Sequence, residues 1–250
     1  MRLLEDSIKQ SLLDNQFLFN YIGDFGKSRV VFEKGLPPKN RLIADALIFT
    51  EKQGIIGVEM KTQYDTLARL ERQLSYYKQI CNYVFVYVHD SHLEGVIDLL
   101  KKRGYWGFVG IVSYTQFHDD VVVGLYKAAE LNPHYNLVYS LKLLWRNEIR
   151  DILQAYTTKH GSLVARNHNL SYQPVFSHHM QMTTGYNGIA SRKFTKRQLI
   201  ANYVKLFGQK NGTQVLCQRF IYGDMNPEKY LKLYRFGDNL GQPEEIGIVT

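Results

Sequence analysis

Apolar residues recur with two different periods along the first half of the chain, and together they predict an α/β protein. Runs of branched apolar residues bounded by turn residues predict strands, and apolar residues at steps of three and four predict helices. We expect strands at residues 41–49, 54–61, 83–88, 108–114 and 121–126, and helices at residues 3–13, 66–80 and 91–103. The run at 83–88 is apolar throughout, which is typical of a buried parallel strand. Strands that alternate with helices indicate a mixed central sheet flanked by helices.

The second half of the chain shows fewer clear patterns. A stripe of leucines and isoleucines predicts a helix over residues 139–156. Thr195 is a good N-cap for a further helix that reaches Phe207. A strand and a last helix are expected at residues 214–222 and 226–235, whereas residues 158–190 remain unassigned. We therefore expect three parts: a core over residues 1–130, a bridging helix within residues 131–157 and a basic α+β extension over residues 158–250.

The first two strands form a hairpin that gathers three charged side chains. If the polar turn between the strands centres on Lys52, Asp45 lies opposite Glu59. Because side chains alternate along a strand, Lys61 shares the face of Glu59 and Met60 takes the other face. Two carboxylates and one ammonium are therefore expected to converge on one side of an otherwise apolar sheet.

This group of side chains suits the metal-dependent hydrolysis of a phosphodiester. Mg²⁺ prefers oxygen ligands and keeps several waters, and carboxylates from neighbouring strands can hold one ion or share two. A lysine beside them can neutralise the developing charge or orient the attacking water. The alternative is a half-buried glutamate–lysine pair without chemistry, and the spacing alone does not decide between the two.

The predicted helix that follows the hairpin adds three more candidate residues. Arg69, Gln73 and Tyr77 are spaced four residues apart, so they lie along one edge of the helix. An amide and a phenol placed directly after the second strand can point at a phosphate or a base. The alternative is that Tyr77 belongs to the core and Gln73 is its solvated neighbour.

These residues resemble the signature of the PD-(D/E)XK nuclease superfamily. Asp45, Glu59 and Lys61 match its catalytic motif. The segment from Gln73 to Tyr77 matches the Gln-x-x-x-Tyr motif of its RecB-like and lambda-exonuclease-like branches. The chain also resembles small bacterial and phage members of that superfamily.

The resemblance covers residues 1–130 and implies a restriction-endonuclease-like fold for them. It implies that Asp45 and Glu59 bind Mg²⁺, with Mn²⁺ able to substitute, and that Lys61 is the catalytic lysine. Gln73 and Tyr77 then belong to the same catalytic group.

Members of this superfamily often add an acidic residue from the first helix. Glu5 fits that role best as a third metal ligand, and Asp6 is the rival. The alternative is an ordinary exposed acid near a helix N-terminus.

The positive charge of the chain is concentrated in its C-terminal part. The formal net charge is +8, yet no acidic residue lies between Asp151 and Asp224. That stretch holds nine of the 31 lysines and arginines, and the other 22 are balanced by all 23 acidic residues. Four of the nine crowd the start of one predicted helix, namely Arg192, Lys193, Lys196 and Arg197.

A helix N-terminus attracts phosphate, and interleaved aromatic residues can stack on unpaired bases. The C-terminal part is therefore predicted to bind nucleic acid, and Arg69 is a further candidate contact. The alternative for the C-terminal part is a basic surface that only aids solubility.

Composition excludes several other classes of protein. No apolar run reaches the roughly 18 residues that a bilayer requires, so no membrane partner is expected. The two cysteines, Cys81 and Cys217, lie far apart, which gives no disulfide framework and suits a reducing cytoplasm. No Cys-x-x-Cys motif occurs, so zinc is not expected.

The sequence thus predicts a cytoplasmic, Mg²⁺-dependent deoxyribonuclease in phage or bacterial DNA processing, repair or defence. Its expected partner is DNA, either duplex or single-stranded, and cutting both strands of a duplex would favour a homodimer or a partner protein. Two alternatives remain open. One is a catalytically inactive nuclease-fold protein that binds DNA or serves in a complex, and the other is an RNA-directed nuclease.

Overall fold

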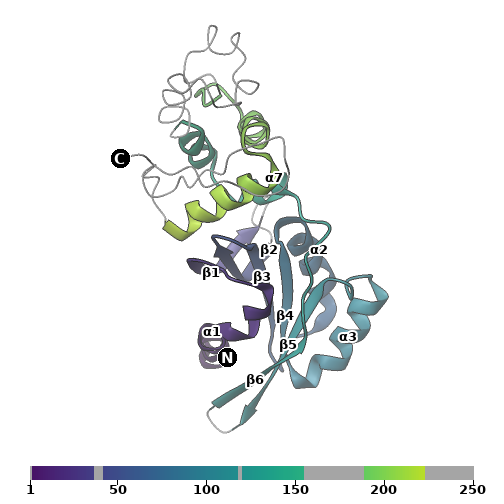
Figure 1. Cartoon of the computed structure of the whole chain (residues 1–250). Coiled ribbons are helices and arrows are strands. Elements are labelled where there is room, and N and C mark those ends of the chain that lie inside the picture. Colours follow the sequence, from purple (N-terminus) through teal and green to yellow (C-terminus); the bar gives the residue numbers. More distant parts are fainter. Residues whose placement is uncertain (1, 37–41, 118–119, 155–188, 223–250) are drawn as a thin grey trace. The chain divides into compact units, whose positions relative to one another are not determined.

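The computed structural model describes residues 2–36, 42–117, 120–154 and 189–222 (Figure 1). The chain divides into two compact units, Met1–Tyr139 and Ser140–Thr250.

The first unit is built on one mixed sheet of six strands in the order β1-β2-β3-β4-β5-β6 (Figure 1). The strands are β1 (Ser28–Leu36), β2 (Leu42–Thr50), β3 (Gly54–Lys61), β4 (Tyr83–His89), β5 (Val109–Phe117) and β6 (Asp120–Lys127). Strand β2 is antiparallel to both β1 and β3, strands β3, β4 and β5 are parallel to one another, and β6 is antiparallel to β5. The predicted α/β class with a mixed central sheet is confirmed.

Helices cover both faces of this sheet. The helical elements are α1 (Arg2–Asp14), the 3-10 helices η1 (Gln16–Ile22), η2 (Leu67–Arg69) and η3 (Asp90–His92), and the α-helices α2 (Leu70–Ile80) and α3 (Leu93–Lys102). Figure 1 shows α1 on one side of the sheet and α2 and α3 on the other. This arrangement follows from the two parallel crossovers, β3-α2-β4 and β4-α3-β5, which share one hand and therefore one face.

Alternation along β2 and β3 decides which residues meet which helix layer. On the α1 side, Ile8 and Phe19 pack in one core with Val58 and Met60. The odd-numbered residues of β3 therefore face α2, where Leu74 and Tyr77 are buried. The predicted division, with Met60 on the face opposite to Glu59 and Lys61, is confirmed.

Gly57 allows α2 to lie close to β3. A Cβ atom at this position would overlap the Tyr77 ring and would come within 2.6 Å of Cys81 Sγ. Both neighbours are fully buried, so neither can move away at low cost. Glycine is required here because of the close approach of two elements.

Replacing Gly57 with Ala is therefore expected to lower the free energy of unfolding by about 2–3 kcal/mol, since overpacking a filled core is costly. Gly124→Ala in β6 is the matched control, because nothing lies within 4 Å of a Cβ atom there. Urea unfolding followed by circular dichroism measures both variants. Equal stabilities of the two would show that α2 does not pack on β3 in this way.

The described part of the second unit is helical. It contains η4 (Leu141–Leu143), a helix over residues 146–154, and α7 (Lys196–Tyr222), and α4 (Leu137–Ser140) precedes η4. The single helix expected over residues 139–156 is wrong, because Leu144 is extended, with ψ 150°, and is buried. Glu148 accepts a hydrogen bond from the Trp145 N–H at 2.6 Å, and the helix restarts there.

The strand expected at residues 214–222 is also wrong, because α7 continues through Tyr222. Gly208, with φ 67°, kinks α7, so the first half ends close to its predicted position. The Tyr203 hydroxyl donates to the Gly212 carbonyl at 2.8 Å and joins the two halves. Val215 and Leu216 are buried in the second half, so their apolar character reflects the buried side of a helix. The last helix, expected at residues 226–235, lies outside the described residues, as do residues 158–188, for which no element was expected.

Candidate functional site

The hairpin register matches the predicted one. Ala46 pairs with Val58 and Phe49 pairs with Ile55, which centres the turn on Lys52. Continued by one residue, this register places Asp45 across from Glu59. The three charged side chains therefore belong to one group on the α2 face of the sheet.

Glu59 and Lys61 form a buried ion pair. Lys61 Nζ lies 2.5 Å from Glu59 Oε1, and the two side chains are 5% and 0% exposed. Asp45 is less deeply buried, and its Oδ2 accepts a hydrogen bond from the Met60 N–H at 2.7 Å. Asp45 is therefore the most exposed member of the group.

Burial dominates the electrostatics of the two acids. It raises the pKa of Glu59 to about 8, and the nearby charge of Asp45 adds to the rise while Lys61 opposes it. Burial also raises the pKa of Asp45, against the Met60 N–H and the Lys61 charge, which lower it. A positive charge placed beside these two carboxyl groups would stabilise their ionised forms.

Tyr77 joins the two strands at the point where their ladder ends. Its hydroxyl donates to the Val58 carbonyl at 3.1 Å and accepts from the Asp45 N–H at 3.0 Å. The side chain is fully buried. Tyr77 is thus a core residue that positions Asp45 relative to β3, as the alternative interpretation expected, whereas Gln73 is buried and not solvated as that interpretation required.

The other candidates of the first unit are less closely tied to the group. Gln73 is 8% exposed, and its buried Oε1 has no hydrogen-bond partner in the described part of the chain. Arg69 is exposed in η2. Glu5 lies within α1, but its side chain is outside those described.

Two residues that sequence reasoning missed fix the end of β3. The Tyr114 hydroxyl donates to the Lys61 carbonyl at 3.3 Å. Asp65 Oδ2 accepts hydrogen bonds from the Thr62 N–H and hydroxyl, both at 2.8 Å. The Thr-x-x-Asp spacing directly after Lys61 was the available signal for this turn.

The donor set can be tested against a divalent cation. Glu59 Oε2 is buried and has no hydrogen-bond partner among the described residues, and Asp45 lies beside it. No group of three or more His, Cys, Asp or Glu side chains that could hold a metal occurs in the described ranges. Two carboxylates fit Mg²⁺, which is commonly bound by one or two of them and completes its shell with water and phosphate oxygens. They do not fit a cation that needs a full cage of protein ligands.

The four cations predicted at the start of α7 differ in their surroundings. Arg192, Lys193 and Arg197 are exposed. Lys196 donates to the Lys142 carbonyl at 2.9 Å. Thr195 and Gln198 form a capping box, in which Gln198 Oε1 accepts from the Thr195 N–H at 2.8 Å and the Thr195 hydroxyl accepts from the Gln198 N–H at 3.3 Å. The predicted N-cap is confirmed.

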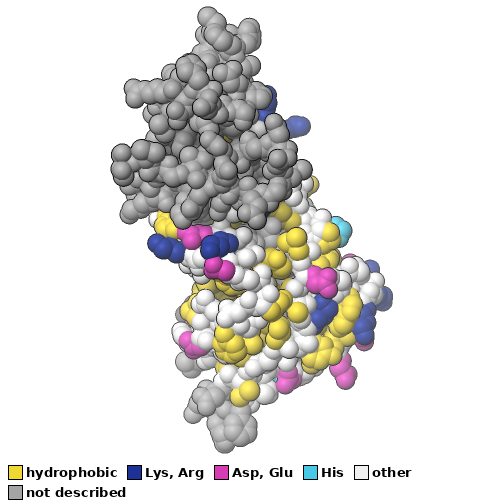
Figure 2. Space-filling view, in the orientation of Figure 1, with side chains coloured by type: hydrophobic (Ala, Val, Ile, Leu, Met, Phe, Trp, Pro, Cys, Tyr) yellow, Lys and Arg dark blue, Asp and Glu magenta, His cyan; other side chains and the backbone are white. Residues whose placement is uncertain are grey.

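The first unit offers no comparable basic surface on the face that Figure 2 shows. Its lysines and arginines are scattered there among acidic and apolar side chains. Among the described helices, none is both long enough and apolar enough to cross a bilayer.

Fold and site define a mixed α/β protein with a buried glutamate–lysine pair and a neighbouring aspartate on its β2–β3 hairpin. The chain belongs to the bacteriophage P4 protein cII family, whose sequence model matches residues 2–205. No curated protein matches the chain, and no solved structure does.

The expected membership of the PD-(D/E)XK nuclease superfamily is wrong. The family comparison assigns the chain to the bacteriophage P4 protein cII family and detects no nuclease family. The signature that suggested it consists of two acids and one lysine, which any hairpin with this register brings to one face. The Gln-x-x-x-Tyr match has its own physical origin, because Tyr77 and Gln73 belong to the buried side of α2.

Proposed function

We propose that this protein is a Mg²⁺-dependent deoxyribonuclease that acts in phage or bacterial DNA processing, repair or defence. One observation carries the proposal. Asp45, Glu59 and Lys61 converge on one face of the sheet, and the buried Glu59 Oε2 has no hydrogen-bond partner in the described structure. Burial raises the pKa of Glu59 to about 8 because an ionised carboxylate is costly in this position, and a bound cation would offset that cost.

Each side chain has a separate role in this proposal. Asp45 and Glu59 would hold Mg²⁺, or Mn²⁺ in its place, and a bound ion would supply polarisation of the phosphate and a more acidic water. Lys61 keeps a positive charge beside the acids, where it offsets negative charge that develops on the phosphate. Tyr77 and the Met60 N–H hold Asp45 in position.

DNA is the proposed partner because the positive excess lies in the second unit, where exposed Arg192, Lys193 and Arg197 can contact phosphates. Cutting of both strands of a duplex would need two sites, which favours a homodimer or a partner protein. Cys81 and Cys217 are both buried, and two cysteines far apart in the chain suit action in a reducing cytoplasm.

A second candidate function rests on the burial of Glu59. Its side chain has no exposed surface and is already paired with Lys61, as is typical of a structural ion pair. The protein would then bind DNA, or serve in a complex, without cutting.

A substrate panel separates the candidates. Linear and circular duplex DNA, single-stranded DNA and RNA are incubated with Mg²⁺, Mn²⁺ or EDTA, and binding of either metal is measured by calorimetry. We expect DNA to be cut with either metal and to stay intact in EDTA. Loss of circular DNA would identify an endonuclease, and loss of linear ends alone an exonuclease.

Other outcomes count against the deoxyribonuclease. Absence of both cleavage and metal binding would favour the non-catalytic function. Cleavage of RNA alone would make the protein an RNA-directed nuclease, and cleavage that persists in EDTA would exclude the metal.

A further inference from the structure

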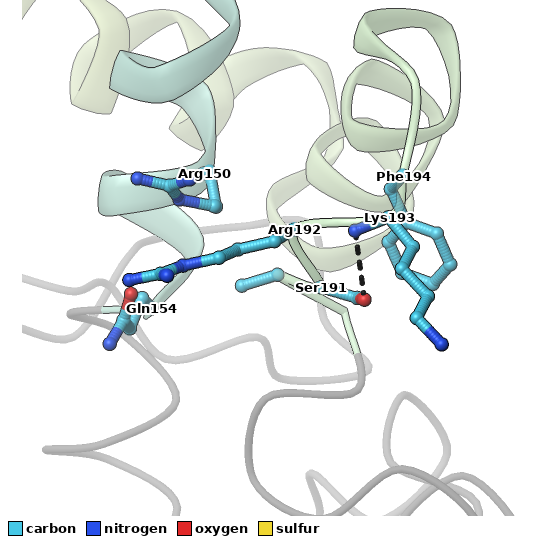
Figure 3. Close-up of a pocket in the computed structure, with 7 residues that line it drawn as sticks. Arg150, Gln154, Ser191, Arg192, Lys193 and Phe194 are labelled. Atoms are coloured by element: carbon cyan, nitrogen blue, oxygen red, sulfur yellow. Dashed lines mark hydrogen bonds between the residues drawn. The ribbon is translucent and has the colours of Figure 1, made fainter.

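The second unit contains a pocket of about 620 Å³ between the helix over residues 146–154 and the loop that leads into α7 (Figure 3). Its lining includes three cations, two polar side chains and one aromatic ring: Arg150, Arg192, Lys193, Gln154, Ser191 and Phe194. None of the described residues that line it is acidic. Pockets of about 300–1,000 Å³ take small organic ligands, so there is room for more than an inorganic anion.

The cations are placed to meet an anion. Figure 3 shows Arg192 extending from the loop toward Arg150 and Gln154 on the neighbouring helix. Arg150 Nε is buried and has no hydrogen-bond partner in the described structure, and the same guanidinium reaches Asp151 through Nη2 at 3.1 Å. A buried guanidinium N–H without an acceptor is stabilised by a ligand oxygen.

The loop is held in shape before any ligand binds. Arg146 Nε donates to the Phe194 carbonyl at 2.8 Å, and Arg146 Nη2 donates to the Arg192 carbonyl. The Ser191 hydroxyl accepts from the Lys193 N–H at 3.2 Å, and the Ser191 carbonyl accepts from the Phe194 N–H at 3.1 Å. Arg146 is thus a positioning residue, and little further ordering of the loop opposes binding.

We propose that this pocket binds the phosphate group of a nucleotide. Two guanidinium groups match phosphate oxygens better than lysines do, and the remaining volume, with Phe194 and Gln154 on its wall, accepts the attached nucleoside. The nucleotide belongs either to a DNA strand or to a free nucleoside phosphate. The inference rests on the nucleic-acid partner of the proposed function and does not require hydrolysis.

The test measures binding of the full chain to a short labelled oligothymidylate by fluorescence anisotropy in EDTA. Arg192→Ala and Arg150→Gln are each expected to weaken binding about tenfold, as loss of a charge-assisted hydrogen bond does. Arg197→Ala is the matched control, because Arg197 is exposed on α7 and does not line the pocket. It removes the same charge and should cost about twofold.

Competitors identify the group that is bound. Thymidine monophosphate should displace the strand better than thymidine, and better than inorganic phosphate, if the pocket holds a whole nucleotide. Strong displacement by the monophosphate identifies a free nucleotide as the ligand, whereas weak displacement identifies a strand. Arg150→Lys keeps the charge without Nε and should resemble Arg150→Gln, and thermal melting confirms that each variant is folded.

Three outcomes would contradict the proposal that this pocket binds a nucleotide. One is equal loss of binding in the Arg192 and Arg197 variants. The second is displacement by thymidine as efficient as by its monophosphate. The third is displacement by an acidic peptide as strong as by DNA, which would indicate a protein partner. EDTA prevents metal-dependent cutting, so the binding test does not depend on hydrolysis. If the protein binds DNA through the pocket but never cuts it, the proposed nuclease activity is wrong and the inference about the pocket still holds.

Discussion

Asp45→Asn is expected to lower Mg²⁺-dependent DNA cleavage by about 10²–10³-fold or more, the scale seen when one electrostatic element of a catalytic site is removed. Asparagine retains an oxygen that can accept the Met60 N–H, which Asp45 Oδ2 now accepts at 2.7 Å. The side chain therefore keeps its position, while its charge toward the cation is lost. Cleavage rates measured with Mg²⁺ and with Mn²⁺ give the effect.

Glu59→Gln should have an effect of the same size, because it removes the second carboxylate and leaves the volume of the side chain unchanged. Asp24→Asn is the control, since Asp24 is an exposed acid that pairs with Lys52. Calorimetric titration provides a second measurement, in which both site variants lose metal binding and the control keeps it. A double variant of Asp45 and Glu59 that cuts DNA as fast as the wild type would eliminate this site.

Much of the first unit could be predicted because each element there obeys a local rule. The hairpin register followed from a turn centred on Lys52, and the side-chain alternation then fixed the faces of Glu59 and Met60. The apolar run at β4 predicted a buried parallel strand, and β4 does pair with β3 in parallel. Such rules depend only on neighbours in sequence.

The second unit resisted prediction because tertiary contacts override local preference there. The segment around Val215 reads as a strand, yet it is helical because its apolar side chains are buried after the Gly208 kink. The pocket was missed as well, although Arg146, Arg150 and Gln154 repeat at a spacing of four and so lie on one helix edge. That spacing was visible, but the loop that completes the pocket comes from about 40 residues further along the chain.

The charges at the candidate site were predictable, but their burial was not. Burial depends on how closely α2 packs on β3, and the only signal of that contact was Gly57, where a larger residue would overlap Tyr77. Because this packing removes water from Glu59, it changes an ordinary surface acid into one with a pKa of about 8. The raised pKa of Glu59 thus depends on the packing of the whole fold, and its effect on stability can be measured.

The free energy of unfolding in EDTA is expected to fall as pH rises from about 5 to 9, and Glu59 should account for most of the change. In the unfolded chain Glu59 releases its proton near its ordinary pKa of 4.5, whereas in the folded chain it does so near 8. Between these values the folded protein binds more protons than the unfolded chain, so the free energy of unfolding falls with rising pH. The stabilisation is complete below about pH 4.5 and is lost as pH rises through about 8.

Glu59→Gln removes the titrating group. Across this pH range the free energy of unfolding of the variant should therefore fall less than that of the wild type, by about 2–4 kcal/mol. Urea unfolding at several pH values measures the difference, and Glu94→Gln, at an exposed position of α3, should keep the wild-type slope. Parallel curves for the wild type and the Glu59 variant would show that Glu59 is not buried as an acid. Added Mg²⁺ should restore stability to the wild type above about pH 8, because a cation binds the ionised carboxylates, and it should leave the Glu59 variant unchanged.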